Sequence, residues 1–344
     1  MAEAPPVRLP AEEVRALAER ALLASGALAE VAELVAAHVV DAELAGHPSH
    51  GLRQIPVYCA NAGSPGNDLT VLPEITDQTQ SLTTVDAHAG LGHPALALAV
   101  DSAAAGAREA GIAAAAVICC GHAGRAGAWV ERGAAQGCVT IVLLGGTTPP
   151  FAMVAAPGAT PALHTNPIAV GAPASGSPLL LDIATSMVAA GKVPIALARG
   201  ASLPEGAIAT VDGRRSGDPA EIARGGALLP VGGHKGFGLS ALVEALSVSL
   251  TGADGAGCDP QEGALVICVD TAAFRPTGEV VSSLDALRAR LRDSSGPGVP
   301  VLAPGDPEAG SRSAAAGNVD VARALVDELT DIASRATPGE DAGA

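Results

Sequence analysis

Aromatic residues are nearly absent from this chain of 344 residues, where they make up 1% of the sequence. Basic residues are also scarce, since 20 Lys and Arg face 36 Asp and Glu and leave a formal charge of −16. Nucleic-acid binding draws most of its affinity from basic side chains on phosphates, and single strands also need aromatic platforms. We therefore expect no nucleic-acid partner.

Long hydrophobic runs are absent too, although 48% of the residues are hydrophobic. Runs such as 112–120 are far shorter than the roughly 20 residues that a membrane-spanning helix needs. The first 25 residues contain four Glu and no basic segment, which argues against a secretory signal. We expect neither membrane attachment nor export.

Cysteine pairs with metal-site spacing do not occur among the six cysteines. Six cysteines in a chain of this length do not resemble a disulfide framework, and most of them lie in apolar runs. No CxxC or HExxH pattern is present, so we expect no metal. The cysteines are interpreted as buried reduced thiols, which indicates a cytoplasmic protein.

Helical periodicity dominates the beginning of the chain. Apolar residues recur at helical spacing over 11–45, and the pattern breaks at 46–51. A short helical piece with Ile55 and Tyr58 follows, and the polar stretch 61–80 reads as a linker. Residues 280–294 and 318–335 look helical again, and the tail after Pro338 is expected to be disordered.

Strands and helices alternate in the middle of the chain, which indicates an α/β or α+β domain. The predicted strands are 82–85, 114–120, 139–144, 179–183 and 265–269. The predicted helices are 95–109, 127–135 and 238–250, the last with Leu239, Leu242, Val243, Leu246 and Leu250 on one face.

Lysine is much rarer than arginine, because the chain has 18 Arg and only Lys192 and Lys235. Both lie next to glycine, and Lys235 precedes a helix predicted to begin near Gly238. Glycine before a helix N-terminus lets free N–H groups approach an anion. Neither a Walker loop nor GxGxxG is present, so a Rossmann site lacks its fingerprint. Either lysine could instead be an ordinary surface residue.

Three further segments could carry chemistry. His50 lies where the N-terminal helical pattern breaks, and a loop His there could exchange a proton or be purely structural. His122 and Arg125 follow the strand ending at Cys120, where ligands of α/β proteins bind, and we expect both to be exposed at that edge. Asp182 ends the strand 179–183 and could orient an imidazole, bind a ribose or cap a helix.

Together these segments resemble the malate/L-lactate dehydrogenase family of the non-Rossmann type, from about Asp41 to Pro304. That family includes ureidoglycolate, sulfolactate and diketogulonate oxidoreductases and a piperideine-carboxylate reductase. The landmarks occur in order: Gly46 to Gly51, Val85-Asp86 with Gly90 to Gly92, His122 to Gly127, Thr165 to Pro167, Leu181 to Ser186 with Gly191-Lys192, Asp212-Gly213 with Asp218-Pro219, Leu229-Pro230 with Gly232 to Gly236, and Pro304 to Asp306.

The resemblance implies a mixed α/β fold with a non-Rossmann NAD(P)-binding domain over 76–284. A helical domain built from 1–75 and 285–344 would flank it. It also implies an NAD- or NADP-dependent oxidoreductase acting on small 2-hydroxy or 2-keto acids, and a homodimer. A cyclic imine acid reductase and a non-catalytic nucleotide-binding member are the alternatives. A lyase or isomerase on the same scaffold is more remote.

The resemblance also implies roles for individual residues. His50 would exchange the proton, Asp182 would lie near the nicotinamide and orient that imidazole, and His122 would contact substrate or serve as an alternative base. The expected substrate-binding residues are Ser49, Arg53, Arg125 and Thr165. The expected cofactor-binding residues are His122, Asp182, Ala184, Thr185, Ser186, His234, Lys235, Gly236, Pro304, Gly305 and Asp306.

Three positions depart from the family pattern. Gln54 stands where many relatives carry Arg, five residues after the motif serine, and Arg53 lies one position earlier. His164 replaces the usual Gly, and Asp306 replaces the usual Glu. These changes bear on the substrate clamp and on cofactor preference. They leave the proton-exchanging His50 in place.

Overall fold

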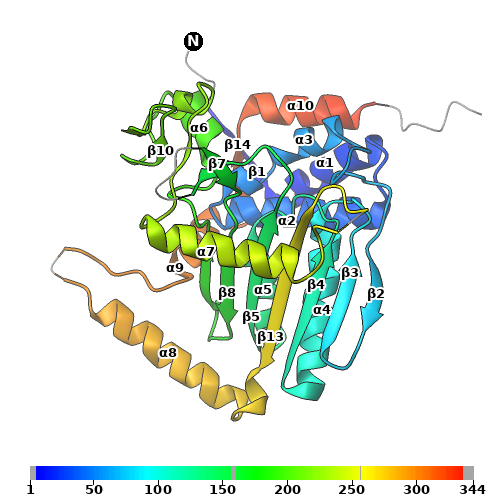
Figure 1. Cartoon of the computed structure of the whole chain (residues 1–344), viewed down its shortest axis with the longest axis vertical. Helices are drawn as coiled ribbons and strands as arrows, with labels where there is room; N and C mark the ends of the chain where they lie inside the picture. Colours follow the sequence, from blue (N-terminus) through cyan, green and yellow to red (C-terminus); the bar gives the residue numbers. More distant parts are fainter. Residues whose placement is uncertain (1–4, 156–159, 256, 297, 336–344) are drawn as a thin grey trace, which may run out of the picture.

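A seven-stranded mixed sheet forms the centre of the computed structural model, which describes residues 5–155, 160–255, 257–296 and 298–335 (Figure 1). The strand order is β2-β3-β4-β13-β5-β8-β9, and only β3 and β4 pair in parallel. The strands are β2 (Glu74–Gln78), β3 (Leu82–Asp86), β4 (Ile112–Ile118), β5 (Cys138–Gly146), β8 (Ile168–Ala172), β9 (Leu179–Ile183) and β13 (Glu262–Asp270).

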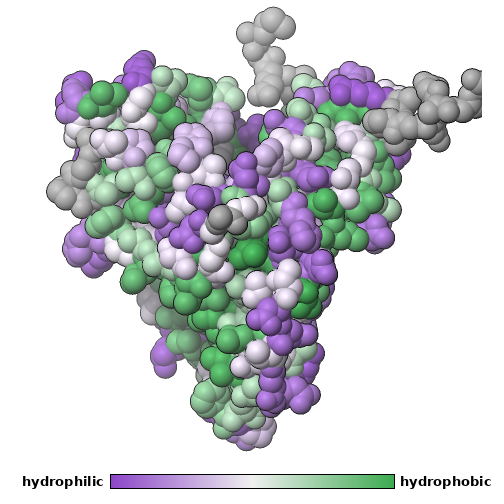
Figure 2. Space-filling model, turned by 45° about the vertical axis from the view of Figure 1, so that its right-hand side comes forward, coloured by the Kyte–Doolittle hydropathy of each residue, from purple (hydrophilic) through white to green (hydrophobic). Residues whose placement is uncertain are grey.

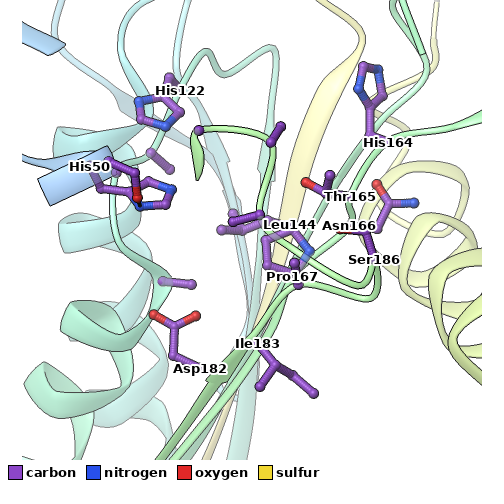
Figure 3. Close-up of a pocket in the computed structure, with 18 of the residues that line it drawn as sticks. His50, His122, Leu144, His164, Thr165, Asn166, Pro167, Asp182, Ile183 and Ser186 are labelled. Atoms are coloured by element: carbon purple, nitrogen blue, oxygen red, sulfur yellow. Dashed lines mark hydrogen bonds between the residues drawn. The ribbon is translucent and has the colours of Figure 1, made fainter. Parts of the chain in front are cut away.

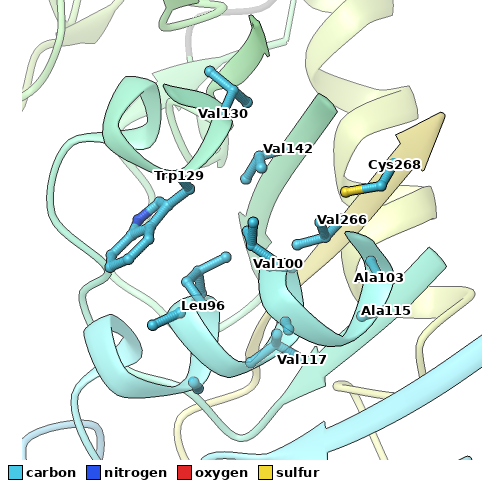
Figure 4. Close-up of a cluster of buried hydrophobic side chains, with 14 of the residues drawn as sticks. Leu96, Val100, Ala103, Ala115, Val117, Trp129, Val130, Val142, Val266 and Cys268 are labelled. Atoms are coloured by element: carbon cyan, nitrogen blue, oxygen red, sulfur yellow. The ribbon is translucent and has the colours of Figure 1, made fainter. Parts of the chain in front are cut away.

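Helices α4 (Gly92–Ala110) and α5 (Ala126–Ala135) cover one face of this sheet. Between helices and sheet lies a core of mostly small aliphatic side chains, with Trp129 at one side of it (Figure 4). Alanine favours the helix and lets α4 lie close to the strands. This explains how a chain so poor in aromatic residues builds a buried core.

The two ends of the chain fold together into a second, helical part. It contains β1 (Val7–Pro10), α1 (Ala11–Ala24), α2 (Ala29–Leu44), the 3-10 turn η1 (Pro48–His50), α3 (Gln54–Ala60), β14 (Asn318–Val321) and α10 (Arg323–Ala333). The strands β1 and β14 pair antiparallel, and the helices share one core. The helical pattern over 11–45 is divided in two at Gly26, which has a positive φ of 91°.

A third part is a small sheet with its own core, ordered β11-β10-β12-β6-β7. Its elements are β6 (Met153–Val154), β7 (Pro161–Leu163), α6 (Lys192–Ala198), β10 (Ile208–Ala209), β11 (Arg215–Ser216), η2 (Pro219–Glu221) and β12 (Ala227–Leu228). The domain boundaries at 75/76 and 284/285 stay a prediction. Within the described ranges, no helix combines the length and the apolar character that crossing a membrane requires.

Helix α7 (His234–Glu244) continues into a π-helical turn, η3 (Ala245–Ser249), and crosses the sheet face opposite α4 and α5 (Figure 1). Helix α8 (Thr277–Asp293) follows the short turn η4 (Thr271–Ala273), and α9 (Asp306–Ala315) packs against α2. Of the apolar face predicted for 238–250, Val243 is buried, but the four leucines are open to solvent, with Leu242 62% and Leu250 67% exposed.

Three secondary-structure predictions are wrong. The linker 61–80 contains strand β2, the pattern over 318–335 begins with strand β14, and α7 starts at His234 rather than near Gly238. The strand β14 depends on pairing with β1 at the other end of the chain, which local periodicity does not reveal. The tail after Pro338 lies outside the described residues.

The interpretation of all cysteines as reduced thiols is wrong for one pair. Cys119 and Cys258 form a disulfide that joins the end of β4 to the loop before β13. The partners are 139 residues apart in the chain, and only the antiparallel pairing of β4 with β13 brings them together. The other cysteines, Cys59, Cys120, Cys138 and Cys268, are free.

Candidate active site

A cleft of about 550 Å³ opens where the strands of the seven-stranded sheet end, beside the helical part (Figure 3). The strands β4, β5 and β9 end here, and β8 and β13 begin here. The side chains that meet in the cleft therefore come from segments far apart in the sequence. They include Ser49, His50, His122, His164, Thr165, Asn166, Asp182, Ala184, Ser186, Lys192 and Glu262.

His50 is presented to the cleft by the turn η1, where the chain leaves α2. The buried Ser49 holds it, with its Oγ 3.1 Å from His50 Nδ1. The amide of Gln54 donates to the Ser49 carbonyl at 2.7 Å. On the other side the backbone of Gly191 lies so close that a Cβ there would be 3.0 Å from Ser49 Cβ. These contacts fix the direction of the imidazole.

Asp182 faces the cleft from the end of β9, below His50 in Figure 3. Its Oδ2 accepts the backbone N–H of Gly127 at 2.7 Å, at the start of α5. Burial lowers the pKa of His50, and the Asp182 carboxylate partly offsets this effect because it favours the charged imidazolium. Asp182 and His50 thus line the same cleft and interact electrostatically, while their predicted pairing and their catalytic roles stay proposals.

His122 follows β4 and lies beside His50, with the two rings nearly parallel and their centroids 5.7 Å apart. The Tyr58 hydroxyl lies 2.5 Å from His122 Nδ1. Part of His122 is open to the solvent in the cleft, but protein surrounds the ring on its other sides. This desolvation lowers the pKa of His122, and the neighbouring His50 lowers it further. The neutral ring is therefore the dominant form at pH 7.

Arg125 does not reach the cleft edge, contrary to the expectation that it is exposed there. Its side chain is 1% exposed and pairs with Asp41, at 2.9 Å, and with Glu131. Arg312 from α9 bonds the same two carboxylates. The guanidinium is therefore held in a buried ion-pair network between the helical part and α5, and it does not line the cleft.

Arg53 also points away from His50. It lines a second cleft of about 380 Å³ on the other side of η1, together with Pro48 and Arg199. The two expected substrate-binding arginines are thus both outside the first cleft. Among the described residues that line that cleft, Lys192 carries the one Lys or Arg side chain.

The wall opposite His50 is formed by Thr165, Asn166 and Ser186 (Figure 3). Asn166 is 1% exposed, and its Nδ2 donates to the Ser240 carbonyl at 3.1 Å and to Glu244 at 3.2 Å. Its Oδ1 is buried without a partner among the described residues. A buried acceptor of this kind suits an N–H donor from a ligand in the cleft.

Several of the expected cofactor-binding residues do not line the cleft, namely Thr185, His234, Lys235, Gly236, Pro304, Gly305 and Asp306. Thr185 is buried, with its hydroxyl on the Thr165 carbonyl, but its neighbours Ala184 and Ser186 do line it. His234, Lys235 and Gly236 begin α7, which is tied to this wall because the Val231 N–H donates to the Thr185 carbonyl. The turn with Pro304 and Gly305 instead packs beside Leu180, and Arg292 holds the Asp306 carboxylate.

Sequence reasoning missed Tyr58, Asn166 and Glu262 as members of the site. Asn166 was noted only as part of the Thr-Asn-Pro landmark, and Tyr58 only as a helical residue. Being the one tyrosine of the chain was a usable signal for Tyr58. Glu262 begins β13 and gave no local signal, because only strand pairing puts it beside β4 and β5.

The cleft thus contains an imidazole bound by a hydroxyl, a carboxylate whose charge acts on that imidazole, a neutral second imidazole, one ammonium group and a buried amide acceptor. Such a set can exchange a proton with a bound molecule and hold a small anion beside it. Among the described residues, no group of three or more His, Cys, Asp or Glu is arranged to hold a metal ion.

Comparison with known proteins gives consistent results. Residues 9–330 match the family described as malate/L-lactate dehydrogenase. A (2R)-3-sulfolactate dehydrogenase (NADP(+)) of Chromohalobacter salexigens is 35% identical over 92% of this chain and 95% of its own length. A Delta(1)-pyrroline-2-carboxylate reductase of Ancylobacter novellus is 35% identical over 96% and 98%. The solved delta1-piperideine-2-carboxylate reductase of Pseudomonas syringae superposes with a TM-score of 0.83, at 31% identity over 95% and 99% of the two chains.

Proposed function

The chain belongs to the malate/L-lactate dehydrogenase family, and from this premise we propose that it transfers a hydride between NAD or NADP and a small 2-hydroxy or 2-keto acid. The observation that carries the proposal is the arrangement of His50, Ser49 and Asp182 around one cleft that also contains Lys192. A keto acid needs a proton for its oxygen and a cation for its carboxylate, and this cleft offers both.

His50 is the proposed proton donor when the keto acid is reduced and the base when the hydroxy acid is oxidised. Its Nδ1 is held by Ser49 Oγ, which leaves Nε2 for the substrate oxygen. Asp182 stabilises the imidazolium form, since its charge raises the His50 pKa against the effect of burial. The bond from the Gly127 N–H keeps that carboxylate in place.

Lys192 is the proposed partner of the substrate carboxylate, in place of the expected Arg53 and Arg125. It begins α6 next to Gly191, which packs against the η1 turn. An ammonium group at this point places a bound carboxylate on the His50 side of the cleft. The Thr165 hydroxyl on the opposite wall can donate a hydrogen bond to the same substrate.

The residues present fit a nicotinamide dinucleotide. When bound, this cofactor supplies or accepts the hydride. The unpartnered Asn166 Oδ1 suits the carboxamide N–H of a nicotinamide, and Ala184 and Ser186 lie on the same wall. His234 and Lys235, at the start of α7, are proposed to hold the phosphates, because a helix N-terminus with a basic side chain binds anions.

A cyclic imine acid is the second candidate substrate class. Its C=N bond is reduced with the same proton donor and the same carboxylate contact, and relatives named for pyrroline-2-carboxylate are as similar as the sulfolactate enzyme. A non-catalytic nucleotide-binding role is disfavoured because His50, Ser49 and Asp182 all line the same cleft and Ser49 is bonded to the His50 ring.

The test is an absorbance assay at 340 nm with NADH or NADPH and a panel of keto acids and cyclic imines. We expect acid-dependent oxidation of one nucleotide by the wild type, and a loss of several orders of magnitude in His50→Ala with unchanged nucleotide affinity. Turnover that survives in His50→Ala would refute the assigned proton donor. Failure to bind either nucleotide would refute the proposed function.

A homodimer is part of the proposal, because a broad apolar surface is left open in one chain. In β9, Leu180 faces the α4–α5 core, so Leu181 and Ile183 project to the opposite face and are exposed. The exposed leucines of α7 lie on that face too, and Figure 2 shows hydrophobic residues gathered over the middle and lower part of the molecule.

We interpret this surface as a protein–protein interface, since exposed apolar patches of this kind mark interaction sites. Light scattering should give twice the chain mass of 33.5 kDa, and Leu242→Glu should shift it to one chain. A monomeric wild type would refute the dimer.

The cytoplasm is the proposed compartment, because the expected cofactors are available there. The disulfide between Cys119 and Cys258 argues in the other direction, since disulfides are rare in reducing compartments. The test is fractionation of cells with detection of the chain by antibody. Recovery in the cytoplasmic fraction is expected, and recovery outside it would refute the proposed compartment.

A further inference from the structure

We propose that Tyr58 is a positioning residue that fixes the tautomer of His122, so that His122 presents Nε2–H to the cleft as a hydrogen-bond donor to a substrate oxygen. The inference rests on the proposed function insofar as that oxygen belongs to the keto acid. It assigns the two imidazoles of the cleft to different tasks, proton exchange for His50 and hydrogen bonding for His122.

Tyr58 is placed by the same segment that presents His50. Helix α3 begins soon after the η1 turn, and it carries Tyr58 into the space beside His122. The side chain is 3% exposed and forms part of the core of the helical region. Its hydroxyl is thus fixed by packing, 2.5 Å from His122 Nδ1, before any ligand enters.

The direction of this hydrogen bond follows from the surroundings of the hydroxyl. Among the described residues, His122 Nδ1 is the one partner of the Tyr58 oxygen. If Nδ1 carried the proton, the phenol would accept, and its own O–H would be buried without an acceptor, at a cost in free energy. If the phenol donates, both groups are satisfied. Nδ1 is then the acceptor, and a neutral ring must carry its proton on Nε2.

Both partners are neutral at pH 7. Burial raises the pKa of the Tyr58 hydroxyl, and burial with the neighbouring His50 lowers the pKa of His122. His93, whose ring centroid is 6.1 Å from that of His122, has a pKa lowered well below 6.5 by burial and adds no charge. Nothing in this cluster therefore favours a protonated His122.

The free Nε2–H of His122 is available to a ligand. The two ring nitrogens point in different directions, and Nε2 has no partner among the described residues. The ring lines the cleft in a nearly parallel orientation to His50. A substrate oxygen that receives a proton from His50 can therefore accept a hydrogen bond from His122. The expected role as an alternative base is replaced, because a ring that donates from Nε2 cannot remove a proton there.

The first test is nitrogen-15 NMR of protein labelled at histidine, with His122 assigned from its loss in His122→Asn. We expect a protonated Nε2 and an unprotonated Nδ1 in the wild type, and a mixture of both tautomers in Tyr58→Phe. A protonated Nδ1 in the wild type overturns the proposal, as does an unchanged spectrum in Tyr58→Phe. This measurement needs no substrate, so it decides the tautomer even if the proposed function fails.

The second test is kinetic. Tyr58→Phe should lower kcat/KM for the keto acid about tenfold, as expected for one misdirected hydrogen bond, and leave nucleotide affinity unchanged. The control is Thr271→Val, which removes a buried hydroxyl that donates to the Gly137 carbonyl, far from the cleft. It should leave kcat/KM and the His122 signals as in the wild type. Equal losses of kcat/KM in both variants would mean that Tyr58 acts only through stability.

Discussion

The imidazole rings of His50 and His122 lie nearly parallel on the same side of the cleft, with an interplanar angle of 11°. They differ in their partners. The Ser49 hydroxyl bonds Nδ1 of His50, and the charge of the Asp182 carboxylate raises the pKa of that ring. The Tyr58 phenol bonds Nδ1 of His122, and no carboxylate contributes to the pKa shift of that ring. Two like side chains therefore acquire different protonation behaviour from their surroundings.

The first prediction concerns the pH dependence of kcat/KM. Burial lowers the pKa of His50, so its titration lies on the acid side of 6.5. Reduction needs the protonated ring, so kcat/KM for the keto acid should be highest below that pKa and fall as pH rises through it. Oxidation needs the neutral ring and should rise through the same pH range and then become flat.

Asp182→Asn removes the charge that raises the His50 pKa, and both curves should move to lower pH. The amide oxygen of Asn can still accept the Gly127 N–H, so the link between β9 and the start of α5 stays in place. Asp101→Asn, which breaks a surface pair with Arg132, is the matched control and should not move the curves. A shift to higher pH in Asp182→Asn would contradict the assigned pairing.

The second prediction concerns the cation for the substrate carboxylate. Lys192→Met should raise KM for the keto acid at least about tenfold, since a charge-assisted hydrogen bond is lost. Arg53→Met should leave KM unchanged, because Arg53 lines the second cleft. The opposite result, with KM raised in Arg53→Met alone, would restore the expected arginine clamp. Steady-state kinetics at fixed nucleotide concentration measures both.

The sequence was sufficient for elements that depend on local pattern. The buried runs that became β4, β5 and β9 and the periodic segments of α4 and α5 were predicted within a few residues. His50 and Asp182, which both line the cleft, were singled out because each lies where an element comes to its end. Features created by pairing between distant segments were missed, such as β14 on β1 and the Cys119–Cys258 disulfide.

The arginines show why side-chain direction was harder to predict than position. Both His122 and Arg125 lie in the segment after β4, as predicted. The His122 ring faces the cleft, however, whereas the Arg125 guanidinium is turned into the protein. The cause is Asp41 on α2, more than 80 residues earlier, which draws the charge inward. Local sequence could not indicate this, because the contact crosses between two parts of the fold.

The third prediction concerns that buried arginine. Arg125→Met keeps much of the volume but leaves Asp41 and Glu131 facing Arg312 alone. Removing one member of a buried ion-pair network costs about 3–5 kcal/mol, so urea unfolding should show a large loss of stability. KM for the keto acid should change little. The exposed pair of Arg214 with Asp212 provides the control, since Arg214→Met should cost less than about 1 kcal/mol.

A raised KM with little loss of stability in Arg125→Met would show that the side chain serves the substrate after all. The two outcomes are separable because stability and KM are measured on the same preparation.

The fourth prediction concerns stability in mild acid. His38 is buried against Trp129 and Arg125, and its pKa is lowered to about 3, chiefly by burial. His93 is fully buried, with both ring nitrogens unpartnered among the described residues and its pKa well below 6.5. Below pH 6.5 the unfolded chain takes up protons at these positions and the folded chain does not. Their contribution to stability is therefore present above pH 6.5 and is lost as the pH falls.

Each such histidine should lower the free energy of unfolding by about 1.4 kcal/mol per pH unit, or about 2 kcal/mol between pH 6.5 and 5. His93→Leu should make this dependence shallower. This substitution should not destabilise the protein at pH 7.5, because neither ring nitrogen of His93 forms a hydrogen bond with a described residue that the change could break. The exposed His234→Gln is the matched control, because it removes a histidine without removing a buried ring. Urea unfolding at pH 7.5, 6.5 and 5 measures the slopes, and equal slopes in wild type and His93→Leu would mean that His93 is protonated in the folded protein.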